Sequence, residues 1–174
     1  MEIFSPASDK KDAYFAKFSQ AFPDTDLKGV EMGSMLFFFA NHIINGFTAH
    51  FSRYGISQAR YGVLLMLYIE SEAEWTPADL ADAGNISRAT MTGLLDGLEK
   101  QGYLVRLPRP GDRRSIIIQL SDEGRRFVDE MLPDHFNRLA DAMGGLSETE
   151  RKTLMKIVPR VLQSMSTLVE DLAP

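Results

Sequence analysis

Residues 103–120 combine two apolar, β-branched segments with a central turn that is rich in proline, glycine and arginine. This pattern predicts a β-hairpin whose turn carries the arginines. The four arginines around the turn are Arg106, Arg109, Arg113 and Arg114. Like charges repel one another at a hairpin tip, so their concentration predicts a polyanionic partner.

The segment before this hairpin has the spacing of a helix–turn–helix. A start signal at Thr76 and Pro77 predicts a short helix over residues 77–83. After a turn at residues 84–85, a second helix is predicted to run to Gln101. In helix–turn–helix domains, the first residues of the second helix face base edges in the major groove of DNA.

The residues at the start of this second helix are therefore candidates for contact with DNA. They are Ser87, Arg88, Thr90, Met91 and Thr92. Arg88 can present two parallel donors to a guanine, and the hydroxyl groups can bond to phosphates or bases. Met91 is expected to belong to the hydrophobic core instead. Either Ser87 or Asn85 is expected to cap the helix, whose N-terminus itself favours a phosphate.

Positive charge is local in a chain that is acidic as a whole. The formal net charge is -5 and the isoelectric point is about 5.2, unlike the balance typical of a nucleic-acid-binding domain. Residues 86–114, however, contain six basic and three acidic side chains. This local surplus indicates where a polyanion would bind.

Several classes of function are disfavoured by what the sequence lacks. It has no cysteine, which excludes disulfides and thiolate metal sites. It has no Gly-x-Gly-x-x-Gly, Walker or Gly-x-Ser-x-Gly motif, so we expect no catalytic residues, no enzyme activity and no cofactor. His42 and His50 would lie about 12 Å apart along one helix, too far to share a metal ion, and we expect no metal site.

The chain is expected to be a soluble, cytoplasmic protein with no membrane contact. No apolar run approaches the roughly 20 residues needed to span a bilayer. The first residues lack the charged and apolar regions of a signal peptide. At 174 residues and 44% hydrophobic, the chain can form one domain-sized core with an appended dimerisation element.

Long helices must position the two candidate DNA-binding elements. Helical spacing predicts a helix over residues 30–54 that is apolar on more than one face, which is typical of burial between layers or subunits. Ser57 is expected to cap the next helix, and Ser121 a later one that ends near residue 143. A capping box at Ser147–Glu150 opens the last helix, whose apolar residues recur with heptad-like spacing suited to a partner helix. These residues are Leu154, Val158, Val161, Met165, Leu168 and Leu172.

The predicted fold class is mainly α with a small β-hairpin wing, that is, a winged helix–turn–helix together with a helical dimerisation region. We assign residues 1–28 to an N-terminal extension and residues 56–121 to the winged, DNA-binding lobe. Residues 29–55 and 122–174 are assigned to the dimerisation region. The extension carries an aromatic stripe that is expected to pack on its own domain or on a partner subunit.

Two stretches of the sequence resemble the MarR family of bacterial transcription regulators. The stretches are residues 87–96 and 111–124. The family's wing signature is Asp-x-Arg, then a strand, then Leu-(Thr/Ser)-x-x-Gly. The matching residues are Asp112 and Arg114, then Leu120, Ser121 and Gly124. Residues 56–64 also resemble the family's second helix, although Arg60 stands where a glutamine is usual.

This resemblance implies a homodimer that binds a pseudopalindromic operator on double-stranded DNA as a regulator, most simply a repressor that occludes a promoter. By the same resemblance, Arg114 would reach into the minor groove and Asp112 would brace the wing. Arg109 and Arg113 are further candidates for DNA contact. Arg106 and Arg109 are otherwise expected to be flanking phosphate contacts or solvated charges. The alternative function is a winged-helix module for protein interaction or dimerisation that does not bind DNA.

The resemblance also implies a small-molecule effector, bound in a cleft between the dimer helices and the DNA-binding lobe. The aromatic and partly polar residues expected to line that cleft are Phe38, His42, Tyr54, Tyr61 and Trp75. Such a pocket would suit a small aromatic or lipophilic acid. For each of these residues, plain core packing is an equally good account.

Overall fold

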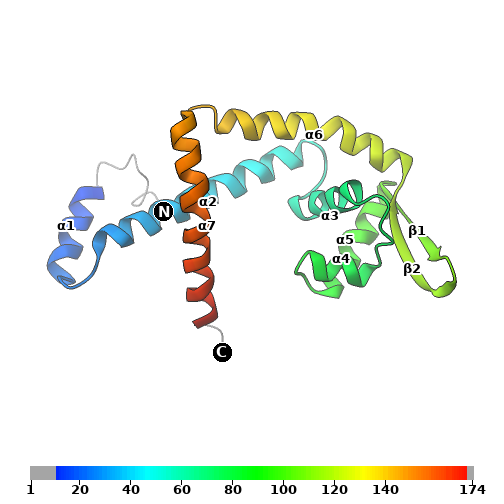
Figure 1. The fold of residues 1–174 in the computed structure, drawn as a ribbon, viewed down its shortest axis with the longest axis horizontal. Helices are drawn as coiled ribbons and strands as arrows, with labels where there is room; N and C mark the ends of the chain where they lie inside the picture. The colour runs from blue at the N-terminus through cyan, green and yellow to red at the C-terminus, as the bar shows by residue number, and fades with distance from the viewer. Residues whose placement is uncertain (1–10, 172–174) are drawn as a thin grey trace. The chain divides into compact units, whose positions relative to one another are not determined.

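The structure contains helices and one two-stranded hairpin (Figure 1). The computed structural model describes residues 11–171, and all of their side chains except those of residues 11, 12, 113, 114 and 168–171. The elements are α1 (Lys11–Ala21), α2 (Leu27–Ser52), α3 (Gln58–Ile69), α4 (Pro77–Ala83), α5 (Arg88–Lys100), β1 (Leu104–Arg109), β2 (Asp112–Leu120), α6 (Asp122–Ala142) and α7 (Glu148–Asp171). The predicted fold class, mainly α with a small hairpin, is confirmed. None of the helices within residues 11–171 has the length and apolarity needed to cross a membrane.

Ser87, and not Asn85, caps the second helix of the helix–turn–helix. Ser87 Oγ accepts a hydrogen bond from the backbone N–H of Thr90 at 3.1 Å. Asn85 lies in the turn between α4 and α5 and takes a left-handed conformation with a φ of 48°. Asparagine tolerates that conformation better than most residues do. The turn therefore uses Asn85 for its backbone and Ser87 to start α5.

Local polar caps also fix the starts of α4 and α2. In α4, the backbone N–H of Asp79 donates to Thr76 Oγ1 at 3.2 Å, and that of Thr76 donates to Asp79 Oδ2 at 3.1 Å. The hydrogen bonds from the hydroxyl and backbone of Thr76 lower the pKa of Asp79 below its usual value. α2 begins at Leu27, earlier than the residue 30 expected from apolar spacing, because the Asp26 carboxylate accepts from the N–H of Gly29 at 3.1 Å.

The described residues form two compact units that divide after Arg125. In the first unit, α3, α4, α5 and the hairpin contact one another, and α2 contacts α3. The fully buried residues of these elements include Leu64 of α3, Leu80 of α4, Met91, Leu95 and Leu98 of α5, Leu104 of β1 and Ile118 of β2. Met91 thus belongs to the core, as predicted. Because Met91, Leu95 and Leu98 hold one face of α5, its opposite face is left for solvent or a partner.

The turn of the hairpin is built from Pro110 and Gly111. Proline fixes the backbone angle that the first position of such a turn needs. Gly111 follows with a φ of 84°, a conformation that residues with a side chain rarely adopt. The two residues that flank this turn, Arg109 and Asp112, are paired in the strand register.

The hairpin has an irregular register near its tip. Pro108 pairs with Ile116, but the next pair along β1 is Arg109 with Asp112. Residues 113–115 are therefore an insertion in β2 that has no paired counterpart in the described part of β1. Proline lacks the N–H that a regular ladder would require at this point, and an insertion of this kind bends and twists a strand. The predicted wing arginines at 113 and 114 thus lie on a bulge.

The second unit consists of α6 from Arg126 onward and α7. Ser147 and Glu150 form the predicted capping box at the start of α7, since the N–H of Ser147 donates to Glu150 Oε2 at 2.7 Å. Several large apolar residues of α7 are exposed in the single chain, namely Leu154, Met155, Ile157, Val158, Leu162 and Met165. Of the predicted heptad seam, Leu168 and Leu172 lie outside the described side chains.

Candidate nucleic-acid interface

The hydroxyl groups at the start of α5 are engaged within the helix itself. Ser87 Oγ caps the helix and also lies 2.8 Å from Thr90 Oγ1 in a hydroxyl–hydroxyl hydrogen bond. Thr92 Oγ1 donates to the backbone carbonyl of Arg88 at 2.8 Å. Thr92 could donate to a phosphate only by giving up its bond to the Arg88 carbonyl, whereas the Ser87–Thr90 pair uses one of its two hydroxyl hydrogens and keeps the other for a phosphate. In this structure Ser87 caps the start of α5, and Thr92 bonds back to the backbone of the same helix.

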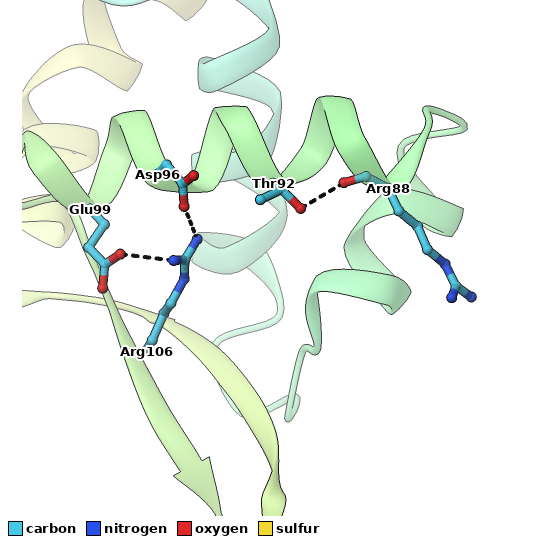
Figure 2. A network of polar contacts seen from close by, with 5 residues as sticks. All are labelled: Arg88, Thr92, Asp96, Glu99 and Arg106. Atoms are coloured by element: carbon cyan, nitrogen blue, oxygen red, sulfur yellow. Dashed lines mark hydrogen bonds and ion pairs between the residues drawn. The ribbon is translucent and has the colours of Figure 1, made fainter.

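Arg88 is placed differently from these hydroxyl residues. Its side chain is exposed and extends away from α5 (Figure 2). Its guanidinium makes no hydrogen bond or ion pair with any residue of the described chain. A guanidinium is a fork of donors that matches guanine or phosphate, and Arg88 would break no contact to use it.

Arg106 joins the wing to the second half of α5. Its Nη2 lies 2.6 Å from Asp96 Oδ1 and its Nη1 lies 3.1 Å from Glu99 Oε2. Figure 2 shows the side chain reaching from β1 to both carboxylates on the helix. The interpretation of Arg106 as a phosphate contact or a solvated charge is therefore corrected: it is a half-buried partner of two acidic residues, with 28% of its side chain exposed. It ties the position of β1 to that of α5.

Arg109 makes a second anchor, at the tip of β1. Its Nε lies 2.8 Å from Glu74 Oε2, and both side chains are partly exposed. Glu74 belongs to the segment between α3 and α4, so the pair holds the wing tip against that segment. Contact of Arg109 with DNA stays a prediction, and it requires Arg109 to leave Glu74 or to share its charge with a phosphate.

Asp112, Arg113 and Arg114 occupy the far side of the hairpin turn. Asp112 opens β2 directly opposite Arg109. The bracing role expected for Asp112 stays a prediction. The backbone at 113 and 114 forms part of the bulge in β2, while the side chains of these two arginines lie outside the described set. Their predicted contacts with DNA are therefore not tested by this structure.

Comparison with known proteins shows which family this chain resembles. Residues 54–115 match the model of the MarR family. The transcriptional repressor YetL of Bacillus subtilis is 26% identical over 90% of this chain and 93% of its own length. The transcriptional regulator PecS of Dickeya dadantii is 34% identical over 64% of this chain and 68% of its own length. The chain belongs to the MarR family. It is a transcriptional regulator of the winged-helix type.

Solved structures of the MarR family share the fold described above. The structure of a MepR–DNA complex from Staphylococcus aureus superposes with a TM-score of 0.65. It is 20% identical in sequence, and the match covers 75% of this chain and 94% of that chain. A MarR-family protein from Bacillus stearothermophilus matches with the same TM-score over 82% of this chain. Both structures are 20% identical in sequence to this chain, and at that identity the structural similarity establishes the winged-helix fold.

The MarR signature after the wing has a clear structural basis in this chain. Ser121 Oγ donates to the carbonyl of Gly102 at 2.5 Å and accepts from the N–H of Gly124 at 2.9 Å. A Cβ atom at position 124 would overlap the backbone carbonyl of Tyr103. Glycine at 124 therefore lets the first turn of α6 approach the end of α5 closely, and Ser121 bonds to both. Ser121 and Gly124 thus hold the first turn of α6 against the residues between α5 and β1, at the base of the wing.

Arg60, which departs from the usual MarR pattern, connects α3 to the end of α5. Its Nη1 donates to Gln101 Oε1 at 3.3 Å, and Gln101 Nε2 donates to the carbonyl of Gly55 at 3.2 Å. The guanidinium also lies so close to Gly97 that a side chain there would displace it. This contact was not predicted from the sequence. The signal that could have found it is Gly97 inside an otherwise regular helix, since such a glycine often marks a close approach.

The five aromatic residues predicted to line an effector site are distributed over three places. Phe38 and His42 are neighbours on α2, with ring centroids 4.8 Å apart. Tyr61 stacks on Phe51, at 4.4 Å, and Tyr54 lies beside His50, at 5.4 Å. Burial raises the pKa of Tyr61 above its usual value.

Trp75 lies apart, against β2, where its carbonyl accepts from the N–H of Ile118 at 2.7 Å. Phe38 and Tyr54 are sixteen residues apart, about 24 Å along a helix, so a cleft lined by both would have to extend along α2. A cleft lined by the set stays a prediction. Among the described residues, no group of three His, Cys, Asp or Glu side chains is arranged to hold a metal ion.

Proposed function

We propose that this MarR-family protein is a homodimeric, ligand-responsive repressor that binds a pseudopalindromic DNA operator. In this proposal, α5 enters the major groove with Arg88 toward the bases, and the wing follows the adjacent minor groove. Arg114 would supply the minor-groove contact, by its match to the family signature.

The observation that carries the proposal is the contrast between Arg88 and its neighbours. Arg106 and Arg109 are committed to Asp96, Glu99 and Glu74, whereas Arg88 projects from the start of α5 with no partner among the described residues. Arg106 fixes the wing relative to α5, and Arg109 fixes its tip relative to the segment between α3 and α4. The unpartnered arginine then stands where a helix–turn–helix presents its base contacts.

Exposed apolar surface supports the homodimer. α2 exposes a run of large apolar side chains, which are Val30, Met32, Met35, Leu36, Phe37, Phe39, Ile43 and Ile44. α7 exposes a second set, in which Met155 is 77% exposed. Soluble monomers rarely expose apolar patches of this extent, so we infer that a second copy of the chain covers them. Light scattering on the eluting protein should give twice the chain mass, and Phe37→Glu combined with Met155→Glu should give a monomer.

Binding to the DNA that flanks its own gene tests the proposal. Fluorescence anisotropy at several salt concentrations should show a linear fall of log affinity with log salt, since basic side chains displace counterions from phosphates. Arg114→Ala should weaken binding by about 1–3 kcal/mol if it reads the minor groove. A winged helix used only for protein contacts would show no salt-dependent binding, and an Arg114→Ala dimer with the parent's affinity would remove the assigned role of Arg114.

A further inference from the structure

A small polar cavity lies at the base of the wing, away from the aromatic residues of α2. Its volume is about 110 Å³, and its walls come from the end of α3, the loop before α4, the last residues of β2 and the first turn of α6. A cavity needs only roughly 10–15 Å³ to hold one water molecule, while pockets for drug-sized ligands have about 300 Å³ or more. The space therefore suits a few waters or one small ligand.

Four of the residues that line the cavity carry a side-chain hydrogen-bond donor. Trp75, Gln119, Ser71 and Arg125 all line the cavity, and Glu70 is the acidic group among the lining residues. The indole Nε1–H of Trp75 is buried and has no hydrogen-bond partner in the described structure. A buried N–H without an acceptor is unfavourable, so an acceptor is expected at this position.

The guanidinium of Arg125 is held at this wall without being neutralised. Its Cζ lies 5.7 Å from the centroid of the Tyr68 ring, a cation–π arrangement that leaves the N–H groups available. Neither Arg125 nor Glu70 makes an ion pair or a side-chain hydrogen bond with another described residue. The residues that line this small cavity thus include a cation, an amide and a hydroxyl that make no side-chain hydrogen bond to another described residue, and the indole N–H of Trp75 is buried beside them.

We propose that this cavity binds a small oxyanion, a carboxylate or phosphate group of a low-molecular-weight compound. The oxyanion accepts from Arg125 and Gln119, beside the ring of Trp75, and these three residues lie on three different segments. Occupancy therefore fixes the end of β2 relative to the loop before α4 and the first turn of α6. Its effect on DNA affinity rests on the function proposed above, whereas the binding itself does not.

Trp75 provides a direct probe because it is the only tryptophan in the chain. The intact protein, labelled with ¹⁵N, has one indole Nε1–H resonance, which is followed without DNA while phosphate or acetate replaces chloride at constant ionic strength. We expect a saturable shift of that resonance and a rise in Tm, because a ligand that binds only the folded state stabilises it. Arg125→Gln should weaken binding about tenfold or more, the loss expected for one charge-assisted hydrogen bond. Arg126→Gln removes the same charge one residue further on, outside the cavity wall, and should leave binding unchanged.

Each outcome decides the proposal. Gln119→Leu, which removes a wall donor from β2, provides a second variant if Arg125→Gln does not fold, and it should also weaken binding. An indole resonance that neither phosphate nor acetate moves would mean that the cavity holds water only, and the proposal would be overturned. Equal shifts in the Arg125→Gln and Arg126→Gln variants would overturn it as well. If the protein binds the oxyanion but binds no DNA, the oxyanion site stands and the function proposed above is refuted.

Discussion

Replacement of Arg106 by glutamine separates an anchoring role from a DNA-contacting role. Arg106 holds β1 to α5 through Asp96 and Glu99, at 2.6 and 3.1 Å. Arg106→Gln keeps a polar side chain but removes both the reach of the guanidinium and the charge that offsets the two carboxylates. We therefore expect a loss of stability together with a wing that is less firmly held to α5.

The size of the effect follows from the exposure of the three side chains. Asp96 and Glu99 are 58% and 41% exposed, so each pair is screened by water and contributes at most about 1 kcal/mol. Together the two pairs give an expected loss of at most about 2 kcal/mol. In a chain of this size, a loss of 1 kcal/mol lowers Tm by roughly 2–4 °C. A double-mutant cycle with Asp96→Asn isolates the coupling within the first pair.

DNA titrations over a range of salt complete the assay. An anchoring Arg106 neutralises no phosphate, so Arg106→Gln should weaken binding while leaving the slope of log affinity against log salt unchanged. Arg88→Gln is the matched control: Tm should be unchanged, and binding should weaken by about 1–3 kcal/mol with relaxed sequence preference, because Arg88 is proposed to face a base. Unchanged Tm together with a reduced slope for Arg106→Gln would refute the anchoring role.

Three further perturbations follow from the same contacts. Gly124→Ala should cost about 1–3 kcal/mol in chemical denaturation, because its methyl group meets the Tyr103 carbonyl; an unchanged or increased stability would contradict that close approach. Glu74→Gln frees Arg109, so DNA affinity and the salt slope should both increase if Arg109 contacts phosphate, and an unchanged slope would exclude that contact. Asp79→Ala should lower Tm at neutral pH, because the lowered pKa means that the ionised carboxylate stabilises the folded state. This difference in Tm from the parent should be lost as the pH falls below 3.8, the ordinary pKa of aspartate, and through the lowered pKa of Asp79 in the folded protein. A difference in Tm that persists in acid would show that the charge is not responsible.

Features that depend on a few neighbouring residues were predictable from the sequence. Ser57 and Thr76 were expected to be caps, and Ser87 was one of two candidates for the third. Each of the three caps its helix by accepting an N–H from three residues ahead. Such hydrogen bonds need only local geometry. The hairpin turn at residues 110–111 was predictable for the same reason, since its proline and glycine specify the backbone angles.

The partners of the arginines could not be predicted in the same way. Asp96 and Glu99 lie three residues apart on α5, which places them on one face of the helix. Their pairing with Arg106 depends on how β1 returns along that face, which is a matter of tertiary packing. Arg60 and Gln101 are 41 residues apart in the sequence, and their contact depends on the packing of α3 against α5. Charge counting thus located the basic region but could not distinguish an anchoring arginine from an available one.

Selection of bound sequences from a random double-stranded DNA library tests the central claim most directly. If two copies of α5 read the major groove, the enriched sequences should be inverted repeats with half-site centres about 10–10.5 bp apart, one helical turn. Arg88→Gln should lose the preference for a base pair in each half-site while still binding DNA weakly. Failure to enrich any repeat, or the same repeat enriched equally by the parent and by Arg88→Gln, would contradict the account.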